Sequence, residues 1–259
     1  MIRDKVSAIS VEHVTVSYNT KPVLVNISLE VPKGKVVGII GPNGAGKSTL
    51  IKSVMGFVAR DYGTVKIFGE VVEHARGKVA YVPQRGQIDW EFPVTVWDVV
   101  LMGRYGHTPW YRSLGHLDRQ VAHRALRDVG MEEYVHRQIG QLSGGQQQRV
   151  FMARALAQES DILLLDEPFA GVDAATERAI AGLLSEAKKK NKTIMVVHHD
   201  LETAAEFFDG IILLNRRLYA YGPPSQVLRT SLLTEVYGGK VMAMDGAAKK
   251  EGTHDRHSH

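Results

Sequence analysis

The chain has 259 residues, of which 44% are hydrophobic and 23% are charged, and its formal net charge is +4 at pH 7. These values exclude a disordered chain and suit one large domain or a domain with a subdomain. The absence of cysteine excludes disulfide bonds and thiolate metal sites, and it favours a reducing compartment. The small positive excess is typical of an anionic partner or, alternatively, of an ordinary solvated surface.

Membrane insertion is not expected from this sequence. Residues 1–5 lack the apolar stretch of a signal peptide. Apolar runs elsewhere are short, and none approaches the ~20 residues of a membrane-spanning helix. If the protein works at a membrane, we expect it to do so as a peripheral subunit.

Hydrophobic periodicity predicts an α/β chain. Residues 9–31 alternate polar and apolar positions, which is typical of antiparallel strands with one solvated face. Residues 36–40 form a run buried on both sides, followed by a glycine-rich turn and a helix over 48–55. Further patterns predict short strands over 63–83, helices from 94 to about 135, a helix through 157, a strand over 162–165, a helix over 174–190, a strand over 193–197 and a helix over 201–207. The alternation of strands and helices in the second half predicts a parallel sheet.

A glycine-rich segment joins the strand at 36–40 to the next helix, and it matches the phosphate-loop pattern G-x-x-x-x-G-K-S/T. Its glycines let backbone N–H groups turn towards phosphate oxygens, and the helix adds the positive end of its dipole. We expect Lys47 to reach the β- and γ-phosphates of ATP and the Ser48 hydroxyl to bind Mg²⁺. The predicted nucleotide-binding segment comprises Gly41, Pro42, Asn43, Gly44, Ala45, Gly46, Lys47, Ser48 and Thr49.

Polar residues follow other predicted strands. Asp166 and Glu167 come after four aliphatic residues, at the carboxyl end of a strand, where open α/β sheets bind ligands. We expect Asp166 to enter the Mg²⁺ shell and Glu167 to polarise the attacking water as a general base. Gln84 also follows a strand, and its amide could bind both Mg²⁺ and water. His199 could bond the γ-phosphate or the water, but the neighbouring His198 leaves the choice of histidine open.

A second glycine-rich turn precedes the helix that runs through 157. It contains Leu142, Ser143, Gly144, Gly145 and Gln146. The serine and two glycines give a bare helix N-terminus, which predicts a second anion-binding surface. No lysine accompanies it, so this surface is not a complete nucleotide site, and the alternative interpretation is a serine-capped helix.

Taken in order, these features resemble the ATP-binding cassette family, from Tyr18 through the phosphate loop and the five-residue signature (residues 142–146) to His199. The resemblance implies that Tyr18 stacks on adenine, a core tyrosine being the alternative, and that Asp173 crosses between subunits. It selects His199, which precedes Asp200, as the switch histidine. It also implies a head-to-tail homodimer, in which the signature of one subunit closes over the ATP and Mg²⁺ held by the other.

The same resemblance implies the fold class. We expect an α/β P-loop NTPase core, with a mixed, largely parallel sheet and an antiparallel β subdomain, plus a helical subdomain. Residues 9–85 and 156–225 would form the core, and residues 86–155 the helical subdomain that carries the signature. Residues 226–259 would be a short C-terminal extension that ends in a mobile polar tail.

Finer features resemble the ATPases of manganese and zinc importers. They lie in residues 87–104, 168–173 and 198–200. This resemblance implies integral membrane permease subunits and, indirectly, a metal-binding solute receptor as partners, at the cytoplasmic face of the bacterial plasma membrane. We expect Trp90 and Phe92 to contact the permease, and the alternative is that both are core aromatics.

We therefore expect an ATP hydrolase that drives import of divalent metal ions, with manganese favoured over zinc and iron, and no nucleic acid as partner. The alternatives are an importer of iron chelates and a soluble, non-transport cassette that acts in DNA repair or on the ribosome. The tail histidines, His254, His257 and His259, could bind a divalent cation weakly, but a flexible polar tail or an engineered remnant explains them as well. Cargo identity is not expected to follow from them, because the ATPase itself carries no cargo.

Overall fold

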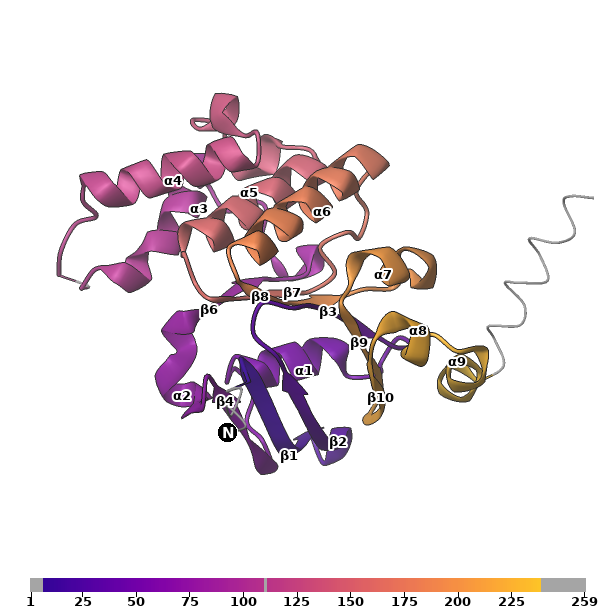
Figure 1. The fold of residues 1–259 in the computed structure, drawn as a ribbon. Helices are drawn as coiled ribbons and strands as arrows, with labels where there is room; N and C mark the ends of the chain where they lie inside the picture. The colour runs from indigo at the N-terminus through magenta and orange to yellow at the C-terminus, as the bar shows by residue number, and fades with distance from the viewer. Residues whose placement is uncertain (1–6, 110, 239–259) are drawn as a thin grey trace, which may run out of the picture.

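The computed structural model describes residues 7–109 and 111–238, and its strands form two sheets with helices packed around them (Figure 1). The strands are β1 (Ile9–Tyr18), β2 (Lys21–Val31), β3 (Val36–Ile40), β4 (Tyr62–Ile67), β5 (Glu70–Val71), β6 (Val79–Val82), β7 (Ile162–Leu165), β8 (Thr193–Val197), β9 (Gly210–Asn215) and β10 (Arg217–Gly222). The helices are α1 (Lys47–Val54), α2 (Val72–Ala75), α3 (Val96–Leu101), α4 (His116–Asp128), α5 (Gly144–Ala157), α6 (Ala174–Lys189), α7 (Leu201–Phe207), α8 (Pro224–Val227) and α9 (Thr230–Tyr237). Short 3-10 turns are η1 (Arg76–Lys78), η2 (Arg85–Gln87), η3 (Met102–His107), η4 (Glu132–Tyr134) and η5 (Ile139–Gln141).

The N-terminal sheet has the strand order β2-β1-β4-β5, and its neighbouring strands are antiparallel. Ile9 and Val11 of β1 are buried, and they pair with the buried Val31 and Leu29 of β2. The predicted antiparallel strands over 9–31 are therefore confirmed.

The stretch from 63 to 83 differs in part from the prediction. β4, β5 and β6 lie there as expected, but α2 and η1 separate the last two strands. Val72 and Ala75 are buried while Glu73 and His74 are exposed, and this spacing suits a helix. A single helical turn offers too few positions for periodicity to reveal it.

The larger sheet has the order β10-β9-β3-β8-β7-β6, and its pairings are parallel except between β9 and β10. The prediction of a parallel sheet is confirmed. At one edge, however, β9 and β10 form an antiparallel hairpin that periodicity did not predict. Because β3, β8, β7 and β6 run in the same direction, the loops that follow them leave from one edge of the sheet. This edge brings the loops with the predicted site residues together.

The central strands β3, β7 and β8 are buried at every position and have the bounds that the sequence predicts. Their side chains alternate between two cores. Val37 and Ile39 of β3 pack with α1 and the antiparallel sheet, whereas Val36 and Ile40 pack with the helical layer on the other face (Figure 1). Packing on both faces therefore fixes the sheet and the loop edge that it carries.

Helices α3, α4 and α5 pack against one another in a layer next to α6 (Figure 1). Arg104 is 4% exposed and ties this layer together, because its guanidinium donates to Asp118 Oδ1 at 3.1 Å and to the Ala157 carbonyl at 2.8 Å. The predicted helices from 94 to about 135 are confirmed in part, since an irregular connection separates η3 from α4. That connection contains Pro109 and Gly115, both poor helix formers.

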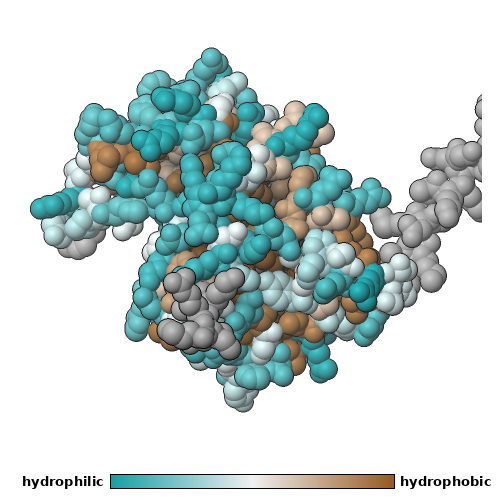
Figure 2. All heavy atoms as spheres, in the orientation of Figure 1, coloured by the Kyte–Doolittle hydropathy of each residue, from teal (hydrophilic) through white to brown (hydrophobic). Residues whose placement is uncertain are grey.

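The helices predicted over 48–55, 174–190 and 201–207 are α1, α6 and α7, with bounds that differ by at most one residue. Within the described residues, no helix is both long and apolar enough to cross a membrane. Figure 2 shows hydrophilic residues over most of the helical layer, with hydrophobic residues exposed at one end of it and near α7.

Candidate functional site

The phosphate loop leads from β3 into α1. Gly46 has a φ of 92°, in the left-handed region, and no side chain caps the helix that follows. A Cβ at this position would lie 2.7 Å from Leu24 Cδ2 and 2.9 Å from the Val23 carbonyl oxygen, so glycine fits where a larger residue would clash. The first N–H groups of α1 therefore remain available to an anion.

Lys47 lies inside the curve of this loop and is 6% exposed. Its Nζ donates to the carbonyl oxygens of Gly41 at 2.7 Å and of Pro42 at 3.0 Å. Burial lowers the pKa of the ammonium, an effect that the nearby carboxylates of Glu167 and Asp166 oppose. The loop thus holds a positive charge beside the helix N-terminus.

Asp166 follows β7 and is fully buried. Its Oδ1 accepts a hydrogen bond from Ser48 Oγ at 2.9 Å, and its Oδ2 accepts one from the Tyr81 hydroxyl at 3.4 Å. Burial raises the pKa of this carboxyl, while the bond from Ser48 opposes the rise. Ser48, Asp166 and the nearby Gln84 amide offer the oxygen ligands that Mg²⁺ prefers, so these residues fit that ion.

Glu167 has a φ of 53°, in the left-handed region, which is uncommon for a residue with a side chain. Its Oε2 accepts a hydrogen bond from Gln84 Nε2 at 2.8 Å. Its Oε1 lies 2.6 Å from His199 Nε2. Both carboxylate oxygens are therefore held in place by residues from neighbouring strand ends.

The structure separates the two adjacent histidines. His199 contacts Glu167, whereas His198 is 4% exposed and bonds to Thr203 Oγ1 at 2.8 Å. The His198 ring also packs against aromatic rings, among them Phe169 at 5.3 Å and Phe208 at 5.4 Å between centroids. His198 is thus a core residue, and the geometry favours His199 as the functional one.

One cavity of about 860 Å³ collects many of the predicted site residues. Tyr18 is 46% exposed at this cavity, which is not the environment of a core tyrosine. Val23 also lines it, and neither Val23 nor Tyr81, which bonds to Asp166, was predicted. The predicted residues that line it are Tyr18, Asn43, Gly44, Ala45, Gly46, Lys47, Ser48, Thr49, Gln84, Glu167 and His199.

The five signature residues do not line this cavity. Ser143 caps α5: its Oγ accepts from the Gln146 N–H at 3.3 Å, and the Gln146 side-chain oxygen accepts from the Ser143 N–H at 2.9 Å. The prediction of a bare helix N-terminus is wrong in this respect, because serine capping, the alternative, is what the structure contains. The N–H groups of Gly144 and Gly145 still precede the first donor within the helix, the Gln147 N–H.

Gly41, Pro42 and Asp166 bond to Lys47 or Ser48 but do not line the cavity themselves, and three other predicted residues lie away from it. Asp173 is exposed and caps α6, where its Oδ1 accepts from the Thr176 N–H at 2.7 Å. Trp90 is half-buried against Phe151, as its core alternative implies, whereas Phe92 is 58% exposed. The two aromatics predicted to act together therefore have different surroundings.

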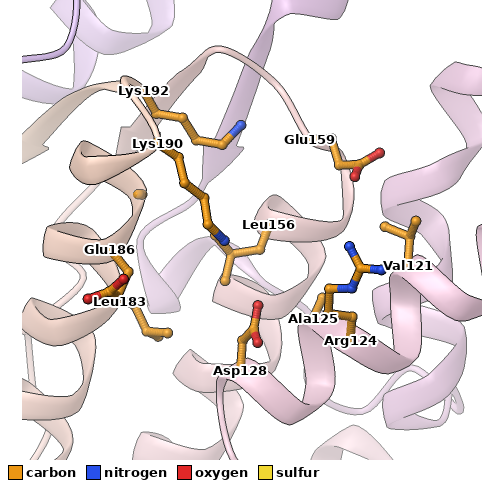
Figure 3. A pocket seen from close by; sticks show the side chains of 11 residues that line it. Val121, Arg124, Ala125, Asp128, Leu156, Glu159, Leu183, Glu186, Lys190 and Lys192 are labelled. Atoms are coloured by element: carbon orange, nitrogen blue, oxygen red, sulfur yellow. The ribbon is translucent and has the colours of Figure 1, made fainter.

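A second cavity, of about 630 Å³, lies where α4, α5 and α6 meet (Figure 3). Aliphatic side chains such as Leu156 line it together with charged side chains of both signs, including Lys190 and Glu186. None of the predicted site residues lines it. Among residues 7–109 and 111–238, no group of three or more His, Cys, Asp or Glu could hold a metal ion, and the tail histidines lie outside these ranges.

A glycine loop that carries a buried lysine, followed by a serine bonded to a strand-end aspartate, defines a P-loop nucleotide-binding protein. The sequence model of the family described as ABC transporter matches residues 24–170. The chain belongs to the ABC transporter family, and it has the P-loop ATPase fold of that family.

Curated relatives match the chain over nearly its whole length. The manganese transport system ATP-binding protein of Bacillus subtilis is 54% identical, over 94% of this chain and 98% of the relative. The zinc transport system ATP-binding protein of Treponema pallidum is 47% identical, over 97% of this chain and 95% of the relative. Among solved structures, an inward-facing ABC transporter provisionally assigned to the metal-chelate type is similar with a TM-score of 0.80 and 28% identity, covering 90% of this chain and 89% of that one.

Proposed function

We propose that this chain is the ATP-hydrolysing subunit of an importer of divalent metal ions, with manganese as the favoured cargo, then zinc or iron. The observation that carries the proposal is the set of contacts joining Ser48 to Asp166 and Glu167 to Gln84 and His199 around one cavity. The 54% identity to a manganese transport system ATP-binding protein supports the choice of cargo.

Several residues of the cavity, and Asp166 bonded to one of them, have distinct parts in the proposed hydrolysis. The first turn of α1 and Lys47 bind the phosphates of ATP, while Ser48, Asp166 and Gln84 would hold Mg²⁺, which would offset phosphate charge. Glu167 accepts a proton from the attacking water, and the Gln84 amide and His199 orient its carboxylate. Tyr18, at the mouth of the cavity, stacks on adenine.

The proposed site is completed by a second copy of the chain. Ser143 and the N–H groups of Gly144 and Gly145 would face the ATP of the partner in a head-to-tail homodimer, with Asp173 in the interface. Exposure of Ser143 and Asp173 supports this arrangement. We infer that residues 9–85 with 156–225 form one body and residues 86–155 the other, and that closure of the dimer drives permease subunits at the cytoplasmic face of the bacterial plasma membrane.

We further propose that Phe92 contacts the permease, and that Trp90 acts indirectly by packing on Phe151. Phe92 lines an apolar groove of about 290 Å³ together with Met102 and Phe151. Phe92→Ala should weaken copurification with the membrane subunit while leaving ATPase activity of the isolated chain unchanged. The matched control is Tyr62→Ala, an exposed aromatic of β4. Equal copurification of both variants would count against this contact.

Two experiments test the proposed function. Glu167→Gln should leave ATP binding intact and lower kcat by about 100-fold or more, as expected for loss of a general base. Normal turnover in this variant would refute the role of Glu167. Deletion of the gene, followed by uptake assays with manganese, zinc and iron, tests the cargo, which reaches the permease through a metal-binding solute receptor. Unchanged uptake of all three ions would favour an iron-chelate importer or a non-transport ATPase.

A further inference from the structure

The loop after β6 reaches two sites at once. Gln84 and Arg85 are neighbours in the chain, and the extended backbone at Gln84 (φ −58°, ψ 139°) directs their side chains to different sides. The Gln84 amide donates to Glu167 in the phosphate-loop cavity. The Arg85 guanidinium lies instead against the first turn of α5, which carries the signature.

Arg85 bonds to one residue of α5 and lies close to another. Its Nε donates to Gln147 Oε1 at 3.2 Å, and Gln147 is 3% exposed. Its Nη1 lies only 2.6 Å from the position that a Cβ on Gly144 would take. Glycine at this position therefore allows the guanidinium to approach the helix backbone closely.

Trp90 and Gln147 restrain this arginine further. The Trp90 indole N–H donates to the Arg85 carbonyl at 3.1 Å, and the guanidinium carbon lies 5.8 Å from the Trp90 ring centre, within cation–π range. The Trp90 ring packs edge-on against Phe151 of α5, with centroids 5.5 Å apart. Gln147 is itself fixed, because its Nε2 donates to the Ile139 carbonyl at 3.2 Å. Arg85 is thus held from the loop side and from the helix side.

We propose that Arg85 is a positioning residue that ties the first turn of α5 to the loop holding Gln84. Any shift of the Gln84 amide and of Glu167 on nucleotide binding then passes through the guanidinium to the signature. This inference rests on the proposed function, in which the signature acts on ATP of a second copy. Arginine suits this role because its planar guanidinium can donate from Nε to Gln147 while Nη1 lies beside Gly144. The single ammonium group of lysine cannot occupy both positions.

The test compares Arg85→Ala, Gln147→Leu and the double variant with Arg119→Ala, an exposed arginine of α4 that serves as the control. Hydrogen exchange at the first turn of α5 measures directly how firmly Arg85 holds that turn, and it does not depend on catalysis. ATP affinity of the single subunit and kcat of the wild-type and variant chains read its consequence. Thermal unfolding of each variant checks that the chain still folds.

Arg85→Ala should raise exchange in the first turn of α5 and lower kcat about tenfold, the size expected for a lost charge-assisted hydrogen bond. ATP affinity of the single subunit should stay within about twofold, since Arg85 does not touch the phosphate loop. In the double variant the two losses of kcat should not add, because both residues act through one contact. Unchanged exchange in Arg85→Ala, or additive losses in the double variant, would overturn the proposal. Lack of ATPase activity in the wild-type chain would instead refute the proposed function. The exchange measurement would still show whether Arg85 holds the first turn of α5.

Discussion

Two helices of this chain begin in glycine-rich turns, and the surroundings of their first turns differ. α1 follows Gly46 without a side-chain cap, and a buried lysine, Lys47, lies beside it with carboxylates from the neighbouring strand end. α5 begins with a capping box made by Ser143 and Gln146. The first turn of α1 is therefore equipped to hold a nucleotide with its metal ion, while that of α5 offers only N–H groups and a hydroxyl.

This difference shows why a helix N-terminus alone is a weak anion site. The helix dipole contributes about 0.3–1 kcal/mol for an exposed charge, which is small for a triphosphate. The α1 turn adds a cation held inside a loop, whereas the signature turn has only its cap and its backbone. Two copies arranged head to tail would combine both turns around each nucleotide. Two predictions test this contrast, and two more concern the adjacent histidines.

The largest effect is expected from Lys47→Ala. It removes the cation from the α1 turn, so affinity for ATP with Mg²⁺ should fall by about 100-fold, as expected for the loss of two charge-assisted hydrogen bonds. Calorimetric titration of the single subunit measures this. Lys189→Ala, at an exposed lysine of α6 paired with Glu186, is the control and should bind ATP as the wild type does. Equal affinities for both variants would refute the role of the loop lysine.

Substitutions of Ser48 and Ser143 should separate nucleotide binding by one subunit from the ATP-dependent association of two. Ser48→Ala should weaken binding of ATP with Mg²⁺ to the single subunit about tenfold, because it removes a metal ligand. Ser143→Ala should leave that binding unchanged, lower ATP-dependent association of the chain, and cost about 1 kcal/mol of folding stability through loss of the cap. Sedimentation with and without ATP distinguishes the variants. If Ser143→Ala weakened binding to the single subunit, the two turns would not be distinct in function.

Substitutions of the two adjacent histidines should affect different properties, namely the rate of hydrolysis for His199 and the stability of the fold for His198. His199→Ala should lower kcat about tenfold or more through loss of its contact with Glu167, with stability little changed. His198→Ala should destabilise the fold by about 2 kcal/mol, because it removes a buried ring that packs on aromatics. Activity assays and chemical unfolding, run on both variants, check this. The reverse pattern would assign the switch role to His198.

The smallest effect concerns pH and the core histidine. Burial lowers the pKa of His198, and the nearby Asp200 opposes this only in part. Below about pH 6.5, the His198 ring binds a proton more readily in the unfolded chain than in the folded chain. The contribution of His198 to the free energy of unfolding is therefore fully present above about pH 6.5 and decreases as the pH falls below that value. His198→Leu should flatten this dependence in unfolding experiments between pH 5 and 8. A slope unchanged by His198→Leu would contradict this assignment.

Much of the fold follows from patterns in the sequence. The strands β3, β7 and β8 were predicted with their bounds because each is a short apolar run between polar turns. The short elements α2, α8 and α9 were not, since one or two turns of helix carry little periodicity. The β9–β10 hairpin also escaped prediction, because strand direction depends on pairing partners that a single sequence does not reveal.

Side-chain direction limited the prediction of the site. The loop residues, Asp166 and Glu167 could be predicted because each follows a buried strand in a parallel sheet. The residues alone did not choose between His198 and His199; the family resemblance did, and the geometry agrees. Tyr81 and Arg85 act from positions whose partners are distant in sequence, so only the folded chain reveals them.

The central claim is that the phosphate loop of one copy meets the signature of another, and a cross-linking experiment tests it directly. The chain has no cysteine, so single cysteines can be introduced without interference. In the Glu167→Gln background, which should retain ATP, Asn43→Cys in one preparation and Ser143→Cys in another place exposed thiols on the two turns. After mixing under mild oxidation, we predict a disulfide-linked heterodimer with ATP and Mg²⁺ and little without them. Failure to form that product with ATP, or a disulfide within a single chain carrying both cysteines, would contradict the account.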